Sequence, residues 1–210
     1  MQKINLKNNL RETYDKYAQD RESSVMQDWK LEERARFLSA LQKEHKHKLL
    51  EIGAGTGRDS KFFQDQGFEV TCIDLSPAMI DLCSQKGLNA FVMDMTKIDL
   101  PDQSFDAVYS MNSLLHLAKD EFSEVLLRIN SLLRPDGIFY LGMYGGYDFA
   151  GVWENDAYTP NRFFSFFTDE HLKEETSKVF EIVSFNRVVF ESDNPSHFQS
   201  VMLRNRLSAK

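Results

Sequence analysis

The sequence has few of the residues that build metal sites and disulfide frameworks. Of its 210 residues only two are cysteine, Cys72 and Cys83, and neither belongs to a Cys-x-x-Cys pattern or lies near a cluster of histidines. Cys72 falls within an apolar strand pattern and Cys83 within a helical one, which is typical of small buried hydrophobic residues. We therefore expect neither a metal centre nor a disulfide.

Long apolar runs and an excess of basic residues are also missing. No stretch approaches the roughly 20 apolar residues of a membrane span, and residues 1–5 lack the apolar core of a signal peptide. The formal net charge is −7, whereas a general nucleic-acid binder needs a basic face for phosphate groups. We therefore expect a cytoplasmic protein that binds no membrane, with nucleic acid a disfavoured partner.

The hydrophobic pattern predicts strands that alternate with helices. Helical patterns over residues 8–43 are followed by strand patterns at 49–52, 68–73, 90–93, 105–110 and 138–143, with helical patterns between most of them. Residues 134–137 read as a turn and residues 147–167 as an irregular, aromatic flap. The last strand patterns, 180–190 and 198–204, are joined by a link too short for a parallel return. We predict a doubly wound, mostly parallel seven-stranded α/β sheet that ends in an antiparallel hairpin, with an N-terminal helical cap.

A glycine-rich turn between the first strand and the following helix is the strongest chemical signal. Glycines at positions 53, 55 and 57 let the backbone approach a ligand closely, at the carboxyl ends of the strands. The dinucleotide fingerprint is Gly-x-Gly-x-x-Gly, and here Arg58 stands where its third glycine would be. A phosphate-binding P-loop is excluded because no Gly-Lys-Ser/Thr follows. The spacing favours a nucleoside cofactor without a pyrophosphate.

Acidic residues end the next two strands. Asp74 follows the glycine turn by about 20 residues, where a carboxylate can accept hydrogen bonds from both hydroxyls of a ribose. Taken alone, Asp74 is equally a helix-capping residue. Asp94 ends the third strand, where it can accept a hydrogen bond from an adenine amino group, with Met95 beside the ring.

Together these motifs resemble the class I S-adenosylmethionine-dependent methyltransferases. The resemblance rests on Glu51, Gly53, Gly55 and Gly57, on residues 74–79, on Asp94 and Met95, on residues 100–106, on Leu115 and His116, and on residues 133–137. Residues 142–146, 162–166 and 197–200 resemble small bacterial members of the family whose substrate is generally unassigned. The resemblance is clear over residues 49–205 and weaker over the cap.

The resemblance implies S-adenosyl-L-methionine as cofactor and a set of residues around it. Gly53, Gly55 and Gly57 would line its methionine and ribose, Glu51 would contact its amino group, and Asp74 would bind its ribose. Asn112 would lie near the methionine end, and Tyr14 and Tyr17 would close a lid. The implied cofactor site is Tyr14, Tyr17, Glu51, Gly53, Ala54, Gly55, Gly57, Asp74, Leu75, Met79, Asp94, Met95 and Asn112.

Direct in-line transfer of the methyl group to a small molecule is the expected reaction, because alignment of the two reactants supplies much of the acceleration. His116 is the candidate base, since its side chain follows the fourth strand and ordinarily titrates near neutrality; otherwise it packs under the sheet edge. Tyr144 either orients the acceptor or forms an aromatic wall. The flap either packs on the fold or covers the acceptor, with Arg162 as a partner for an acidic group.

Three other functions are alternatives to a small-molecule methyltransferase. The first alternative is a methyltransferase whose acceptor is tRNA or protein. The second is a non-catalytic module that binds S-adenosylmethionine. The third is a nicotinamide-dependent oxidoreductase, which the glycine spacing disfavours. We expect one domain over residues 1–210, with a helical cap at 1–45, a cofactor-binding core at 46–146, and a flap, helix and hairpin at 147–210. Monomer and homodimer both remain open.

Overall fold

A seven-stranded sheet forms the centre of the computed structural model, which describes residues 2–190 and 196–206. Its strands are β1 Lys48–Ile52, β2 Glu69–Asp74, β3 Asn89–Val92, β4 Phe105–Met111, β5 Leu133–Gly145, β8 Phe180–Val189 and β9 His197–Asn205. The strand order is β3-β2-β1-β4-β5-β9-β8. The first five strands are parallel, and β9 pairs antiparallel with both β5 and β8. The predicted fold is confirmed.

The direction of the strand order reverses between β1 and β4. From β1 the chain steps outward to β2 and β3, then returns to the other side of β1 to form β4 and β5. In open α/β sheets a crevice forms at this switch point, outside the carboxyl ends of the strands. A ligand site is therefore expected where β1, β2 and β4 end.

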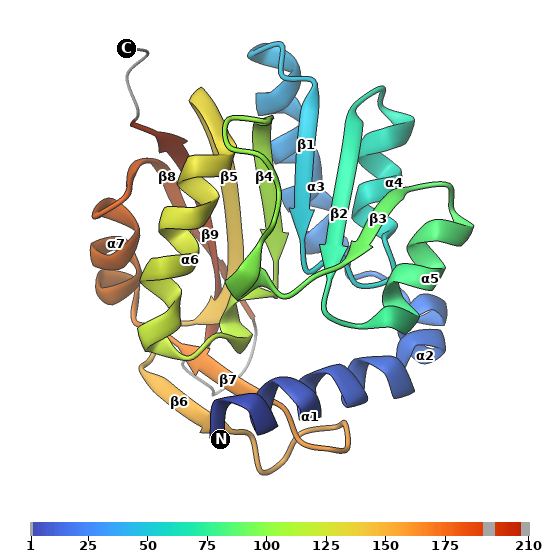
Figure 1. Ribbon diagram of the computed structural model, residues 1–210. Helices are drawn as coiled ribbons and strands as arrows, with labels where there is room; N and C mark the ends of the chain where they lie inside the picture. The colour runs from blue at the N-terminus through green and yellow to red at the C-terminus, as the bar shows by residue number, and fades with distance from the viewer. Residues whose placement is uncertain (1, 191–195, 207–210) are drawn as a thin grey trace.

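Helices cover both faces of the sheet (Figure 1). The α-helices are α1 Gln2–Lys16, α2 Ala18–Ser23, α3 Asp28–Lys43, α4 Arg58–Asp65, α5 Pro77–Gln85, α6 Lys119–Leu132 and α7 Asp169–Ser177, with short 3-10 turns η1 Met95–Lys97 and η2 Leu114–His116. One face packs against α3, α4 and α5, and the other against α6 and α7. No helix of the described part of the chain is long and apolar enough to cross a membrane.

The helix ends follow local rules that the sequence displays. The Ser76 side chain accepts a hydrogen bond from the Met79 N–H, and Pro77 occupies the first helical position of α5. Thr168 caps α7 in the same way through the His171 N–H. These two caps mark where α5 and α7 begin.

A large apolar cluster lies on each side of the sheet. On one side, an apolar stripe of α6 with a 3.6-residue repeat is buried against the sheet at Phe122, Val125, Leu126 and Ile129. On the other face the ring of Phe37 from α3 lies 5.5 Å from that of Tyr109 and 5.9 Å from that of Phe63. These clusters fix the sheet as a rigid base for the residues at its carboxyl edge.

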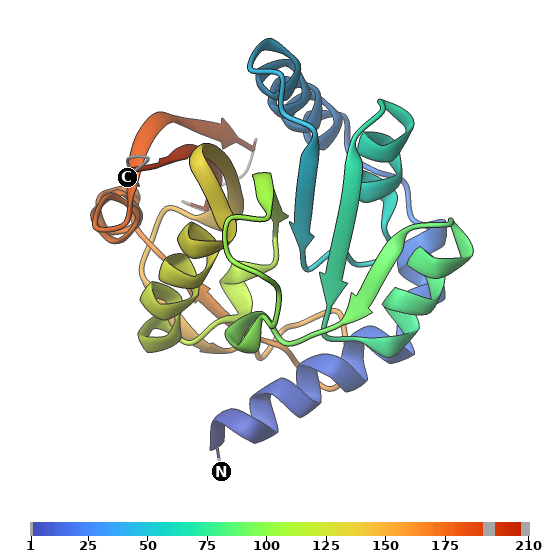
Figure 2. The same ribbon diagram turned by 45° about the horizontal axis from the view of Figure 1, so that its top comes forward.

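Helix α1 and a small second sheet lie across the carboxyl ends of the strands (Figures 1 and 2). The second sheet pairs β6 Phe149–Val152 antiparallel with β7 Phe163–Phe166. The prediction of an irregular flap was wrong in this respect, because β6 is short and contains a glycine, and alternation is hidden in the largely aromatic β7.

Several boundaries also differ from those predicted. Helix α1 begins at Gln2, several residues before the expected start. Residues 134–137, expected as a turn, lie within β5, where Asp136 takes a positive φ of 60° inside the strand. The link at 192–195 lies outside the described residues, but the antiparallel pairing of the two strands it joins is confirmed.

Replacing Phe37 by alanine should lower the free energy of unfolding by about 3–5 kcal/mol, because a fully buried ring packed against three others is lost. Urea denaturation measures the change. Leu31→Ala on the same helix is the control, since Leu31 is 38% exposed. A loss below about 1 kcal/mol for Phe37→Ala would show that α3 contributes little to the core.

Candidate functional site

The glycine turn is held against the end of β2 by the backbone. The N–H groups of Gly53 and Ala54 both donate to the Ile73 carbonyl, at 2.8 and 3.0 Å. Gly53 has a φ of 72°, and a Cβ there would lie 2.1 Å from Ser113 Oγ. Only glycine combines this backbone conformation with so close a neighbour. The turn therefore passes directly beneath the end of β4.

Asp74 is fixed at the end of β2 by two backbone donors. Its Oδ2 accepts from the Gly55 N–H and its Oδ1 from the Ser76 N–H, both at 2.9 Å. Burial raises the pKa of the Asp74 carboxyl, and the two hydrogen bonds oppose that rise. One carboxylate thus connects the glycine turn to the start of α5 and faces the crevice in a fixed orientation.

Glu51, at the end of β1, is 3% exposed and accepts a hydrogen bond from the Ser60 hydroxyl. Burial raises the pKa of Glu51 well above its ordinary value, and the neighbouring Asp59 adds to the effect. A carboxyl group in this state gains most from a cation, because a nearby positive charge restores its ionised form. Glu51 therefore suits an ammonium ligand.

A two-lobed cavity opens where these residues meet. The two lobes are open to solvent and share five lining residues, Arg21, Gly53, Gly55, Met111 and Asn112. The first lobe is also lined by Leu10, Tyr14, Ile52, Ile73, Asp74, Leu75, Met93, Met95, Ser113 and His116. The second is also lined by Ser24, Val25, Met26, Lys30, Glu51, Ala54, Thr56, Arg58 and Asp59.

The two lobes differ in chemistry. Leu75, Met93 and Met95 give the first lobe apolar walls beside the Asp74 carboxylate, which suits a flat ring attached to a sugar. The second lobe is lined by charged side chains of both signs. A nucleoside in the first lobe and an amino-acid group in the second would fill the cavity.

Asn112 lies at the junction of the lobes. Its backbone has a positive φ of 55°, which asparagine tolerates better than most residues, and its N–H donates to the Gly142 carbonyl at 2.7 Å. Asn112 Oδ1 and the neighbouring Ser113 Oγ are buried, and neither has a hydrogen-bond partner within the described part of the chain. Buried polar atoms of this kind are ordinarily satisfied, so they mark places where a bound ligand supplies the partner.

Tyr14 and His116 meet across the cavity. The Tyr14 hydroxyl lies 2.7 Å from His116 Nε2, and His116 Nδ1 lies 2.8 Å from the Phe163 carbonyl. Because a carbonyl only accepts, Nδ1 carries the proton and Nε2 accepts from Tyr14. Burial lowers the pKa of His116 to about 3, and the charges of Arg162 and Arg21 act in the same direction. The imidazole is therefore neutral at physiological pH.

Arg162 is already paired within the flap. Its guanidinium makes a two-pronged contact with Asp156, at 2.7 and 2.8 Å, and donates to the Tyr14 hydroxyl at 3.2 Å. An acidic acceptor would have to compete with Asp156 for it. The guanidinium joins the flap to α1.

Most of the predicted cofactor residues come together, and a few do not. Those lining the cavity are Tyr14, Glu51, Gly53, Ala54, Gly55, Asp74, Leu75, Met95 and Asn112, with His116 from the predicted catalytic pair. Gly57 instead caps α4 with a φ of 78°, and Met79 is buried within α5. Asp94 accepts hydrogen bonds from Lys7 Nζ (3.1 Å) and from the N–H of Thr96 (2.8 Å), so its carboxylate faces α1.

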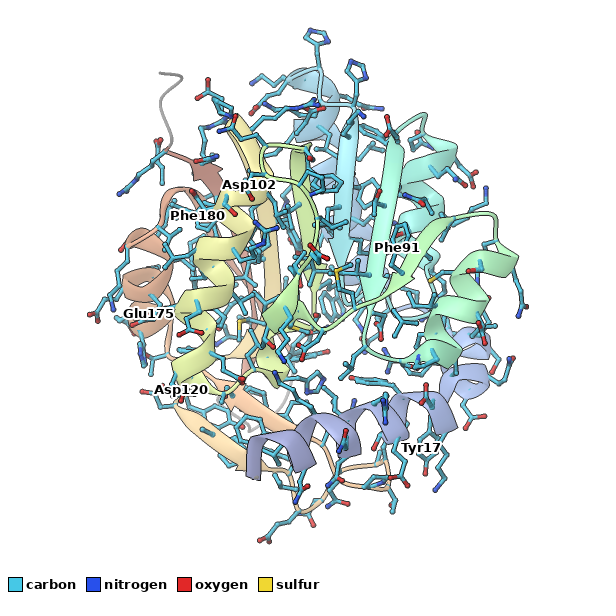
Figure 3. All side chains as sticks on the ribbon, viewed as in Figure 1. Tyr17, Phe91, Asp102, Asp120, Glu175 and Phe180 are labelled. Carbon is cyan, nitrogen blue, oxygen red and sulfur yellow. The ribbon has the colours of Figure 1, made fainter. Side chains whose placement is uncertain are left out.

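Two predicted aromatic residues lie beside the cavity lining rather than in it. Tyr17 lies on the outer side of α1 (Figure 3) and stacks on Tyr158, with ring centroids 4.6 Å apart. Tyr144 packs among Trp29, Phe190 and Phe198. The roles assigned to both residues stay predictions.

The lining residues that sequence reasoning missed include Leu10, Arg21, Lys30 and Ser113. The first three belong to the cap, where only helical patterns were predicted. The signal available for Arg21 and Lys30 was their positive charge close to an expected ligand with a carboxylate. Ser113 carried no signal, since its closeness to Gly53 is a property of the folded chain.

Comparison with known proteins agrees with this geometry. Residues 50–141 match the model of a family described as a methyltransferase domain. The crystal structure of Burkholderia thailandensis 1,6-didemethyltoxoflavin-N1-methyltransferase, which holds S-adenosylhomocysteine, superposes with a TM-score of 0.70 at 26% identity, covering 93% of this chain and 87% of that one. Residues 50–141 thus form a methyltransferase domain, and the chain resembles the class I S-adenosylmethionine-dependent methyltransferases.

The curated relatives of this chain are named for different acceptors or for none. A putative methyltransferase of Bacillus subtilis, YqeM, is 31% identical over 120 residues, which cover 54% of this chain and 49% of the relative. The tRNA N(3)-cytidine methyltransferase METTL2 of Danio rerio is 30% identical over 118 residues, which cover 50% of this chain and 33% of the relative. The chain thus spans only a third to a half of these relatives.

Gly53→Ala should weaken the binding of S-adenosylhomocysteine at least about tenfold, because the added Cβ displaces Ser113 or the turn itself. Isothermal titration calorimetry measures the change. Gly67→Ala is the matched control, since Gly67 also has a positive φ of 90° but has open space around it. Equal binding by Gly53→Ala and wild type would contradict the close packing of the turn.

When the pH is lowered from about 7 to about 5, His116 alone should decrease the free energy of unfolding by about 1–2 kcal/mol. The folded state keeps the imidazole neutral down to a pKa of about 3, whereas the unfolded chain takes up a proton near the ordinary 6.5, so stability is lost as the pH falls. Chemical denaturation of His116→Gln should show a smaller fall. His45→Gln, at an exposed position, should retain the fall of the wild type.

Proposed function

We propose that this protein transfers a methyl group from S-adenosylmethionine to a small-molecule acceptor. The observation that carries the proposal is the two-lobed cavity at the switch point, with the Asp74 carboxylate in one lobe and Glu51 in the other. Asp74 would bind the ribose hydroxyls and Leu75 and Met95 would enclose the adenine. Asn112 Oδ1 and Ser113 Oγ, both buried without a described partner, would receive polar contacts from the ligand.

S-adenosylmethionine supplies an electrophilic methyl group on a sulfonium sulfur that leaves as a neutral thioether. The residues around the cavity therefore need to align two reactants and to exclude water. The turn at Gly53, the fixed Asp74 carboxylate and the unusual backbone of Asn112 supply a rigid frame for this alignment.

His116 is the proposed proton acceptor where the acceptor carries a proton that must leave. Its Nε2 is the unprotonated nitrogen, and the Tyr14 hydroxyl occupies it. A proton therefore reaches His116 through Tyr14 or after Tyr14 moves aside. The low pKa of His116 makes it a weak base, so this arrangement suits an acceptor that is already a good nucleophile.

Contacts between the cap and the flap favour a small acceptor. The Thr13 hydroxyl donates to the Pro160 carbonyl at 2.5 Å, Lys16 donates to Thr159, and Arg162 donates to Tyr14. These bonds tie α1 to the flap over the carboxyl ends of the strands. Such a cover admits a small molecule more readily than a folded RNA or protein. We infer that cap, core and flap act as one unit.

A tRNA acceptor is the second candidate, and the similarity to a tRNA N(3)-cytidine methyltransferase favours it. The formal charge of −7 weighs against a large RNA surface. A module that binds the cofactor without turnover is the third candidate, since the residues that hold a cofactor do not by themselves require an acceptor.

One experiment separates these candidates. The protein is incubated with S-adenosylmethionine labelled in its methyl group, together with the low-molecular-mass fraction of a cell extract or with bulk tRNA. We expect label in a small molecule and formation of S-adenosylhomocysteine. Asp74→Ala should abolish both, because the ribose loses its carboxylate partner, whereas Asp65→Ala at an exposed position should leave them unchanged.

Label in tRNA alone would favour the second candidate. Cofactor binding without any labelled product would support the third. Failure of the wild-type protein to bind S-adenosylmethionine would overturn the proposal.

A further inference from the structure

The second lobe of the cavity has a cation that the protein itself does not pair. Its three cationic side chains are Arg21, Lys30 and Arg58. Arg58 donates to the Ser24 carbonyl at 2.6 Å, and Arg21 lies over the Tyr14 ring, 5.3 Å from its centroid. The Lys30 ammonium makes neither a hydrogen bond nor an ion pair with any residue in the described ranges; its Nζ lies 5.2 Å from the centroid of the Trp29 ring.

The surroundings of Lys30 are those of a site for an anion. Burial lowers the pKa of Lys30, and the charges of Arg21 and Arg58 lower it further. The acidic neighbour, Asp59, is held by Arg34 at 2.9 Å. A half-buried ammonium beside two guanidinium groups is unfavourable unless a negative charge joins it. A bound ligand can supply that charge.

The same lobe contains a site for a cation on its sheet side. Glu51 projects there from the end of β1, and its buried carboxyl group favours a positive partner. The lobe thus has an acid from the sheet and bases from the cap. A zwitterion, with an ammonium and a carboxylate on one carbon atom, matches this pair of charges.

We propose that Lys30, assisted by Arg21, binds the carboxylate of the methionine part of S-adenosylmethionine, opposite the Glu51 contact to its amino group. The inference rests on the proposed function, because it requires this ligand in the cavity. Arg21 lines both lobes and so lies between the nucleoside and the amino-acid group.

This assignment makes the cap a part of the cofactor site. Within residues 50–141, which match the methyltransferase family model, the cation in the second lobe is Arg58, and it is bonded to Ser24. Lys30 and Arg21 both lie before that range. The core that matches the family model would therefore hold the nucleoside and the amino group, and the cap would complete recognition by holding the carboxylate.

The test compares two ligands that differ by the carboxylate. Isothermal titration calorimetry is carried out with S-adenosylmethionine and with decarboxylated S-adenosylmethionine, on the wild-type protein and on Lys30→Met. Because a hydrogen bond between charged groups is lost, Lys30→Met should bind S-adenosylmethionine about ten- to a hundredfold more weakly. It should bind the decarboxylated ligand as the wild type does. The Lys30 ammonium makes no hydrogen bond or ion pair to the described part of the protein, so the substitution removes no polar side-chain contact that holds the scaffold.

Three further variants make the result specific. Lys43→Met, at the exposed end of the same helix, should bind both ligands as the wild type does. Lys30→Arg should restore binding of S-adenosylmethionine in large part. Glu51→Gln should weaken both ligands, since both retain the amino group.

Two results would overturn the inference while leaving the proposed function intact: equal weakening of both ligands by Lys30→Met, or no weakening of either. A wild-type protein that binds neither ligand would overturn the proposed function and this inference with it.

Discussion

The Asp74 carboxylate connects the parts of the chain on which the candidate site depends. It ends β2, accepts from Gly55 in the glycine turn and from Ser76 at the start of α5, and thereby holds both against the sheet. The Ser76 hydroxyl in turn donates to Asp15 of α1 at 2.6 Å. A single side chain thus relates the sheet, the turn and the cap. Its burial is unfavourable in isolation, and the two backbone donors offset that cost.

The parts of the structure that follow local rules were predictable from the sequence. The order of strands and helices, the Ser76 and Thr168 caps and the glycine turn all express backbone preferences over a few residues. The second sheet was not predictable, because both strands are only four residues long, β6 contains a glycine, and the aromatic residues of β7 mask any alternation of apolar and polar positions. Similarly, the positive φ of Asp136 allows β5 to continue through a segment with the composition of a turn.

The candidate site was predictable where residues follow a strand directly, and less so in the cap. Gly53, Asp74 and Asn112 lie at strand ends, and the topology of a parallel sheet brings them together. Arg21 and Lys30 reach the same cavity from helices that could have been placed in many ways. The tautomer of His116 likewise depends on the Phe163 carbonyl, which is close to it only in the folded chain.

The seam between α1 and the flap has a consequence for the timing of ligand exchange. It consists of side-chain hydrogen bonds from Thr13, Lys16 and Arg162, each of which contributes only about 0.5–1.5 kcal/mol in the presence of competing water. A seam of this kind is closed most of the time and still opens readily on the microsecond-to-millisecond scale of lid motions. Entry and departure of ligands would then be gated by the simultaneous breaking of these bonds, and the frequency of that event sets an upper limit on turnover.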